Sequence, residues 1–470
     1  MELNIEALSV VGLPEEESYQ LQQLIEIYAS HRSKNALKNE YYEGEIKLSR
    51  VNLGIALPKS FAGLSIGCSW GEKTVDVLAS RSMFDGFVGA DGNTIEQLDR
   101  IVEANNLIFQ YQKASSDELK YGCTFATLSK DDTSGCKIRF HSPETAAAIW
   151  DGSKGRISCG FAVIDTAPDE KDETMWVPSL VNLYTENAIW VLSRDGSIWS
   201  AERYAHKLGR PMMEPLIWNA TSKKPFGQSR LKSKIRDMID GYVRTMANAT
   251  IGLEFSTSPQ KYILGVTDDQ FDAVINDKFR QYVGNMVAAT PNPETGSNPV
   301  FGQLAQGSLS PHVEMLRMLS TQFSAATGLT VTDTGVVNDA NPTSSEAILA
   351  QSQTLVALAE KLNTGNGVAL KTIALMALAI AQNTTIEGLP EDSREVVAHF
   401  RNPSMPSVSV TADAAIKIAS ARQGFASTDV FLEMLGFDPA DIRRIKAQEQ
   451  ISRGQTTLME LEAETEVDTE

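Results

Sequence analysis

The stretch from Leu231 to Phe255, LKSKIRDMIDGYVRTMANATIGLEF, decides the architecture of this chain. Its apolar side chains recur at the spacing of one helix face, namely Ile235, Met238, Ile239, Tyr242 and Met246. This period predicts a long amphipathic helix. The remaining positions carry charges, at Lys234, Arg236, Asp237, Asp240 and Arg244. Such a helix needs neighbours that cover its apolar face, so the rest of the fold is expected to pack around it.

The segments that follow alternate between loop and helix. Residues 290–299 are rich in Pro, Gly and Asn, which predicts an exposed loop. A second helix is expected over 310–328, because serine and then proline open it and glycine ends it. Residues 329–342 are small and acidic, with no lysine or arginine. A capping box at 343–346 then opens a long alanine-rich helix that reaches Gln382.

The remainder of the chain predicts a mixed α+β fold. Helices are expected over 15–37, over 72–81 and after a capping box at 94–97. From Tyr121 to Trp218 short runs of Val, Ile, Thr and aromatic residues predict antiparallel strands. Turn residues divide these runs, for example at Asp151-Gly152 and Asp195-Gly196. Two compact helices are expected near the end, one capped by Ser427-Thr428 and one begun by Asp438-Pro439.

Composition excludes several classes of protein. The chain of 470 residues has 60 Asp and Glu against 42 Lys and Arg, a net charge of −18, which disfavours binding to nucleic acid by phosphate neutralisation. Its four cysteines form no C-x-x-C pair and its five histidines are scattered, so no metal or other cofactor is predicted. No secretory signal is read, and the longest apolar run, 372–381, is shorter than the roughly 20 residues that span a bilayer. We expect a protein made inside the cell, with no membrane partner.

One short stretch, Gly67-Cys-Ser-Trp-Gly-Glu-Lys-Thr74, nearly satisfies two catalytic motifs. Gly67 to Gly71 fit the G-x-S-x-G elbow of serine hydrolases, with Ser69 as nucleophile. The same stretch misses a phosphate-binding loop by one residue, because Glu72 stands where glycine is required. The plain alternative is a tight turn that leads into an ordinary helix, and we prefer it.

The order of several short segments resembles the portal proteins of tailed bacteriophages, in particular the siphophage head-to-tail connector family. The segments are Tyr41-Tyr42-Glu43-Gly44, Thr74-Val-Asp-Val-Leu-Ala-Ser-Arg81, His206-Lys-Leu-Gly-Arg-Pro-Met-Met-Glu-Pro-Leu-Ile217, Phe226-Gly-Gln-Ser-Arg-Leu231, Asn341-Pro-Thr-Ser-Ser-Glu346 and Leu435-Gly-Phe-Asp-Pro439. Each is short and weak alone, while their order and spacing cover nearly the whole chain.

The resemblance implies a division of the chain into the parts of a portal subunit. These are an α+β wing over 1–230, a first stem helix over 231–255, a clip over 256–309, a second stem helix over 310–328, a tunnel loop over 329–342, a long helix and return to the wing over 343–415, and a helical crown with an acidic tail over 416–470.

The resemblance also implies a function without chemistry. Portal proteins form a ring, usually of twelve copies, at one vertex of the capsid, and double-stranded DNA passes through its channel during packaging and ejection. The implied partners are the terminase large subunit, the head-completion adaptor, and the major capsid and scaffold proteins. The implied location is the virion, after assembly in the host cytoplasm. The alternative from residues alone remains a serine hydrolase using Ser69.

Site residues follow from the same resemblance. The tunnel loop implies DNA-channel residues at Thr330, Thr332, Asp333, Asn338, Asp339 and Asn341, the stem implies Lys234, Arg236 and Arg244, and the clip implies motor or adaptor contacts at Asn292, Glu294 and Asn298. The acidic loop composition independently suits a channel that must not bind phosphates. The alternatives stay open: a polar surface loop, a solvated helix face with pairs such as Arg236 with Asp240, and a flexible clip loop.

Overall fold

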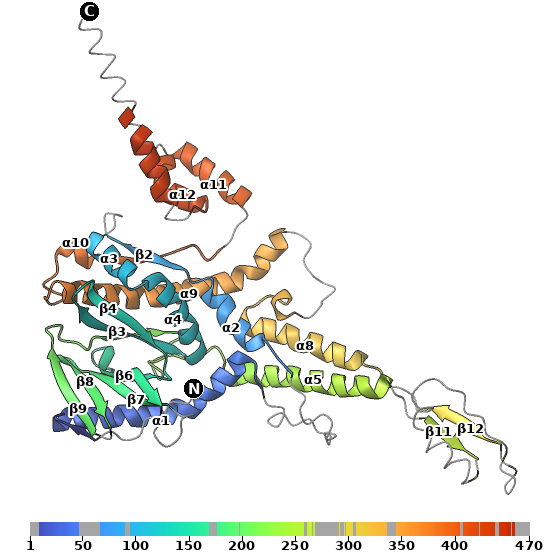
Figure 1. Ribbon diagram of the computed structural model, residues 1–470. Coiled ribbons are helices and arrows are strands. Elements are labelled where there is room, and N and C mark those ends of the chain that lie inside the picture. Colours follow the sequence, from blue (N-terminus) through green and yellow to red (C-terminus); the bar gives the residue numbers. More distant parts are fainter. Residues whose placement is uncertain are drawn as a thin grey trace, which may run out of the picture. The chain divides into compact units, whose positions relative to one another are not determined.

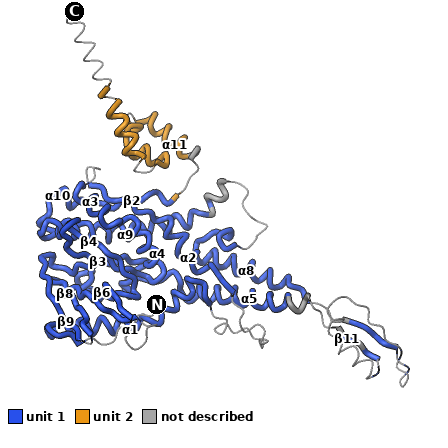
Figure 2. Tube along the Cα trace, in the orientation of Figure 1, with its two compact units in different colours: residues 1–403 blue, residues 404–470 orange. Residues whose placement is uncertain are grey.

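The computed structural model divides the chain into two compact units, residues 1–403 and residues 404–470 (Figure 2). The residues that it describes are 9–46, 66–89, 95–168, 176–196, 198–257, 261–265, 267, 291, 296, 298–303, 307–335, 345–404, 408–422, 424–437, 441–452 and 454–455.

A six-stranded sheet forms one part of the first unit. Its strands are β1 (Val10–Val11), β5 (Ala146–Asp151), β6 (Arg156–Pro168), β7 (Trp176–Tyr184), β8 (Ala188–Asp195) and β9 (Ile198–Ala205). The order is β1-β9-β8-β7-β6-β5, with neighbours antiparallel except for the parallel pair β1–β9. The predicted turns at Asp151-Gly152 and Asp195-Gly196 are confirmed, since they join β5 to β6 and β8 to β9. Helix α1 (Glu15–Glu43) covers this sheet with Leu21, Leu24 and Tyr28.

A second core lies between a three-stranded sheet and a long helix. The sheet has the order β10-β3-β4, from β10 (Met213–Ile217), β3 (Cys123–Asp131) and β4 (Gly135–His141). Its surroundings are α3 (Glu96–Ala104), α4 (Leu107–Tyr121) and α9 (Ser345–Ala381). Within the described residues, α9 is long and apolar enough to span a membrane, yet 56% of that apolar window is buried inside the protein. Burial against the sheet therefore accounts for its composition.

The chain returns to its first half after α9. The short helix α10 (Glu391–Arg394) leads into β13 (Val397–Phe400), which pairs antiparallel with β2 (Phe84–Val88). The contact is reinforced by an ion pair at 3.3 Å between Arg401 and Asp85. Residues more than 300 positions apart thus share one small sheet.

Most of the stretch Leu231–Phe255 lies in α5 (Ser233–Thr257), which lies side by side with α8 (Ser310–Thr327) (Figure 1). Both helices were predicted, including the proline in the first turn of α8 and the left-handed glycine, Gly328, that ends it. Between them in the chain, β11 (Lys261–Leu264) pairs antiparallel with β12 (Val300–Gln303). Helix α2 (Trp70–Ala79) and a 3-10 turn, η3 (Thr332–Thr334), complete this region.

The second unit contains α11 (Val408–Ala421), the 3-10 turn η4 (Phe425–Ser427), α12 (Asp429–Met434) and a helical segment over 441–452. The predicted cap is confirmed, because the Thr428 side chain accepts a hydrogen bond from the Phe431 backbone N–H at the start of α12. The start of the second predicted helix, Asp438-Pro439, lies outside the described residues.

Three helices depart from the prediction. Helix α2 spans Trp70–Ala79, whereas residues 72–81 were expected. Helix α1 continues to Glu43, six residues beyond the predicted end, and stops where Gly44 adopts a left-handed φ of 72°. Helix α4 was not predicted. Its sequence hides the apolar period, because Ser115, Glu118 and Lys120 are buried together with Tyr111 and Leu119.

Candidate functional site: the helix pair and the loop after it

Helices α5 and α8 form one packed pair. Ile239, Val243 and Ala247 of α5 and Leu319 and Phe323 of α8 belong to a single buried cluster. Gly241 lets the helices approach closely, because a Cβ added there would lie 3.3 Å from a methyl group of Leu319. This interlocking apolar face is the partner that the amphipathic pattern of Leu231–Phe255 required.

Trp70, the first residue of α2, joins the helix pair to the rest of the first unit. Its ring centroid lies 4.6 Å from that of Tyr242 on α5 and 4.5 Å from that of Phe323 on α8. The indole N–H donates to the carbonyl of Thr334 at 3.0 Å. Only 2% of Trp70 is exposed, so one side chain contacts both helices and the loop that follows them.

The described beginning of that loop, residues 329–335, is held by its own turn and by α2. The Asp333 carboxylate accepts hydrogen bonds from the Thr330 N–H at 2.9 Å and from the Thr330 hydroxyl at 2.8 Å. The ammonium group of Lys73 donates to the Asp333 carbonyl. The hydroxyls of Ser320 and Thr334 share a buried hydrogen bond of 2.6 Å. The first turn of the loop therefore has a defined conformation.

Arg230 provides a second link, from the residues just before α5. Its guanidinium group donates to the carbonyl of Thr74 on α2 at 2.7 Å and to the carbonyl of Thr327 at the end of α8 at 2.6 Å. Burial lowers the pKa of Arg230 to about 10, which still leaves the side chain charged at neutral pH. Thr327 is the last residue of α8, so its carbonyl has no partner within the helix, and a charged donor to it is a strong hydrogen-bond arrangement.

The Tyr41-Tyr42-Glu43-Gly44 segment connects α1 to both neighbouring helices. The Tyr41 hydroxyl donates to the Asp240 carboxylate on α5, at 2.7 Å and 2.9 Å to its two oxygens. The Tyr42 hydroxyl donates to the Asp76 carboxylate on α2 at 3.0 Å. Gly71 allows α2 to cross the end of α1, because a Cβ there would lie 1.8 Å from the Tyr41 carbonyl oxygen.

These contacts give the Gly67–Thr74 stretch a structural role. Lys73, which a phosphate-binding loop would aim at phosphates, binds the carbonyl of Asp333. Burial raises the pKa of the Cys68 thiol to about 12, so it stays protonated and unreactive. Ser69 is exposed at the start of α2, and its side chain makes no cap hydrogen bond. The preferred interpretation as a turn into an ordinary helix is the one that the contacts fit.

The predicted site residues are not all brought together. In the loop, Thr332 is exposed, Thr330 and Asp333 are half-buried in their turn, and Asn338, Asp339 and Asn341 lie outside the described residues. On α5, Lys234 and Arg244 are exposed. Arg236 lies with its guanidinium carbon 5.7 Å from the centre of the Tyr41 ring. Asn298 is exposed just before β12, while Asn292 and Glu294 lie outside the described residues.

Sequence reasoning missed the residues that hold this region together, Trp70, Arg230 and Tyr41. The available signal was weak. Trp70 stands at a variable position of the G-x-S-x-G motif, and Arg230 lies in the Phe226–Leu231 segment, which resembles portal proteins without indicating a role for this residue. Their partners Phe323 and Thr327 are distant in the chain, so local periodicity contains no information about them.

Comparison with known proteins identifies the class. Residues 21–454 match the family described as "Phage portal protein, SPP1 Gp6-like". The chain is 23% identical over 412 residues to the portal protein of Mycobacterium phage D29, and 24% identical over 414 residues to that of Mycobacterium phage L5. These matches cover 85% and 86% of this chain and 82% of each relative. A chain from the neck of a native gene transfer agent (GTA) particle computed with C12 symmetry is similar at a TM-score of 0.48 and 13% identity, over 84% of this chain and 94% of that chain.

Because the family match spans most of the chain, this protein belongs to the phage portal protein family of the SPP1 Gp6-like type. It is a structural component of the phage virion at the portal vertex, and its α+β fold is confirmed. The alternative of a serine hydrolase using Ser69 is wrong, because the family is structural and non-enzymatic.

Proposed function

We propose that twelve copies of this chain form a ring whose channel passes double-stranded DNA during packaging and ejection. In this ring α5 and α8 are the stem helices, and residues 329–342 are the tunnel loop. The β11–β12 pair belongs to the clip of residues 256–309, the part before residue 231 is the wing, and residues 416–470 are the crown. The observation that carries the proposal is the α5–α8 pair anchored to α2 in a chain of the portal family.

The surface of α8 supports assembly. Val313, Met315 and Met318 are large apolar residues on this helix, and 47%, 39% and 47% of each is exposed. Met315 and Met318 are three residues apart and share one face of the helix, and exposed apolar residues that share a face mark contact surfaces. Neighbouring stem helices in a ring would cover them.

The loop and stem residues have proposed roles within the channel. Thr332, Asn338, Asp339 and Asn341 present small polar or acidic groups to passing DNA, which avoids the affinity that phosphate neutralisation would create. Asp333 supports this surface through its bonds to Thr330. Of the stem cations, Lys234 and Arg244 are exposed on α5 and are the candidates for contact with DNA or a neighbour.

The proposed partners beyond DNA dock at two places. The clip, including Asn292, Glu294 and Asn298, contacts the terminase large subunit during packaging and the head-completion adaptor afterwards. The wing and crown contact the major capsid and scaffold proteins. A variant without residues 268–297 that still bound the terminase large subunit would refute the clip assignment.

Electron microscopy in negative stain, together with mass photometry of the purified protein, tests the ring. We expect particles with a central hole and a mass of about twelve times the 51.3 kDa chain. A protein that stays monomeric at micromolar concentration, alone and with its capsid and scaffold proteins, would overturn the proposal.

A further inference from the structure

A basic groove lies where α1, the strand edges and the residues leading into α5 meet. It has a volume of about 950 Å³ and an apolar wall that includes Phe125, Phe226 and Ala146. The groove is lined by six lysines and arginines, Lys34, Lys38, Lys224, Lys232, Lys234 and Arg236. No carboxylate lines it, although the chain as a whole carries a net charge of −18. Glu144 belongs to the same loop as Pro143 of the wall, yet it does not line the groove.

The cations at the rim of this groove lack carboxylate partners among the described residues. Lys34, Lys224, Lys232 and Lys234 are exposed, and none of them forms a described ion pair. Like charges gathered on one concave surface repel each other and attract an anionic partner. An apolar wall below the charges favours a protein segment with both carboxylates and apolar side chains over a nucleic acid.

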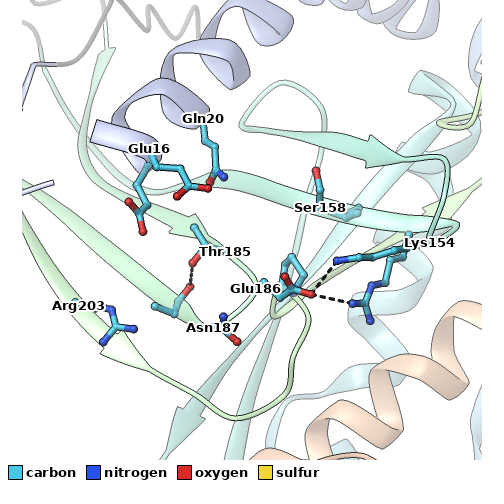
Figure 3. A pocket seen from close by; sticks show the side chains of 13 residues that line it. Glu16, Gln20, Lys154, Ser158, Thr185, Glu186, Asn187 and Arg203 are labelled. Carbon is cyan, nitrogen blue, oxygen red and sulfur yellow. Dashed lines mark hydrogen bonds and ion pairs between the residues drawn. The ribbon is translucent and has the colours of Figure 1, made fainter. Parts of the chain in front are cut away.

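A different pocket of the first unit shows what a neutralised site looks like. In this pocket of about 340 Å³, Lys154 and Arg156 both bind the Glu186 carboxylate, at 3.0 Å and 3.2 Å (Figure 3). Glu16 and Glu17 also line this pocket, together with Arg203, so its cations have anions from the same chain. None of the residues that line the basic groove is a carboxylate, so an anion for its exposed lysines is expected from outside the subunit.

The complementary surface lies at the other end of α1. Glu15 and Glu16 are exposed there, next to two exposed apolar side chains, Val11 at 66% and Tyr19 at 63%. Glu16 also lines the pocket of Figure 3, whereas Glu15 does not. From Ser9 to Ser30 the chain has four glutamates and no lysine, arginine or histidine. We name this surface the acidic knob: Val11, Glu15, Glu16 and Tyr19.

The knob and the groove cannot meet within one subunit. Both lie on or beside α1, and Tyr19 and Lys34 are separated along this helix by about 22 Å at 1.5 Å per residue. Figure 1 shows α1 running from the β9 edge of the sheet to the start of α5. A rigid helix keeps its two ends apart, so contact between these surfaces requires a second copy.

We propose that the acidic knob of one subunit inserts into the basic groove of the next, in a head-to-tail contact. The two patches differ, so the contact is heterologous, and contacts of this type close into rings when the rotation between copies allows it. The glutamates meet the rim lysines, and Val11 and Tyr19 cover the apolar wall. This inference rests on the proposed ring, and it assigns one of the contacts that hold it together.

Charge exchange tests the pairing. The groove variant K34E/K232E and the knob variant E15K/E16K should each raise the protein concentration needed for half-maximal assembly at least tenfold, as measured by mass photometry. A chain with all four substitutions restores opposite charges at every contact, so its midpoint should return to within threefold of the original. The control K130E/K207E reverses two exposed lysines outside the groove and should assemble normally.

The outcomes separate this inference from the proposed function. If the unaltered protein forms rings and the groove and knob variants form them equally well, the pairing is wrong and the ring stands. Failure of the fourfold variant to assemble, while its melting temperature is unchanged, also overturns the pairing. If the unaltered protein never forms rings, the proposed function fails, and the pairing fails with it.

A cross-linking experiment tests the same pairing without charge reversal, in case the charge-exchange variants fold poorly. The double variant E16C/K232C, treated with a bismaleimide of about 10 Å span, should give a ladder of covalent multimers. Glu16 lies in the first turn of α1, whereas Lys232 lines the groove just before α5, so the two cysteines of one chain are too far apart to join each other. The native cysteines are all buried, which keeps the background low. Rings that yield no ladder would refute the pairing.

Discussion

Glu118 is a buried carboxyl group whose ionisation should make the first unit less stable at high pH. The side chain is fully buried on α4, and one carboxyl oxygen accepts from the Asn366 amide of α9 at 2.7 Å. The same amide donates to the Tyr111 hydroxyl at 2.9 Å. The other carboxyl oxygen has no hydrogen-bond partner among the described residues. Burial raises the pKa of Glu118 from 4.5 to about 8, so the neutral form is favoured in the fold.

The sign and size of the effect follow from proton linkage. Between pH 4.5 and 8 the folded state holds a proton on Glu118 that the unfolded state has lost, so stability falls as pH rises through this window. The contribution of Glu118 to stability is greatest below pH 4.5 and lowest above pH 8. At 1.36 kcal/mol per pKa unit the loss is roughly 3 to 5 kcal/mol. Glu118→Gln keeps the shape and one carbonyl acceptor and cannot ionise, so it should not show this loss.

The melting temperature (Tm), measured as a function of pH, tests this loss of stability. An unfolding entropy of about 2.1 cal/mol/K per residue over about 400 residues converts the loss into a change in Tm of about 4 to 6 °C. We expect E118Q to melt higher than the unaltered protein by this amount at pH 9 and within about 2 °C of it at pH 5. The exposed E103Q variant on α3 is the control and should follow the unaltered protein. Parallel Tm profiles for E118Q and the unaltered protein, at equal concentration and assembly state, would refute the buried-carboxyl reasoning.

Three further predictions concern α2, its contacts with the helix pair, and the loop that follows α8. Gly71→Ala should lower the stability of the first unit by about 3 kcal/mol or more, because its Cβ meets the Tyr41 carbonyl, whereas Gly67→Ala, which has open space around it, should change Tm by less than 1 °C. Trp70→Ala should cost about 3 to 5 kcal/mol and increase hydrogen exchange in α5 and α8, and unchanged exchange would contradict its role as the link. Thr332→Lys adds an exposed cation to the loop and should slow DNA packaging in an ATP-driven assay, while an unchanged rate would count against a loop that faces DNA.

The fold was predictable where periodicity and capping act locally. Helices α5 and α8 have a clear apolar face or the proline and glycine signals of their ends, and the strands from β3 to β10 are divided by turn residues. Helix α4 was not predictable in this way, because Glu118 and Lys120 are polar and buried. Their burial depends on partners such as Asn366, which lies 248 residues further along the chain. Such contacts form only after the tertiary fold exists, and no window of local sequence contains them.

The segments that make up the site could be predicted from the sequence. The side-chain contacts that hold these segments in place could not. The composition of residues 329–342 indicated a polar loop, yet Asp333 directs its carboxylate to Thr330, which a list of acidic residues cannot reveal. The predicted roles of the loop, stem and clip residues toward DNA and partners remain predictions. Their tests must separate side chains that hold the loop from side chains that face the channel, and Thr332 is the better probe for that reason.

The Gly67–Thr74 stretch shows why a motif must be interpreted by its contacts. Two glycines and a serine fit a catalytic elbow, but Gly71 is required by a helix crossing and Trp70 by an aromatic stack on α5 and α8. Lys73 and Trp70 both bind carbonyls of the loop, at Asp333 and Thr334. Hydrogen bonds therefore link the start of this loop directly to α2, and through Tyr42 and Asp76 to α1. If α1 also carries the contact between subunits, one helix connects the loop of residues 329–335 in one subunit to the neighbouring subunit.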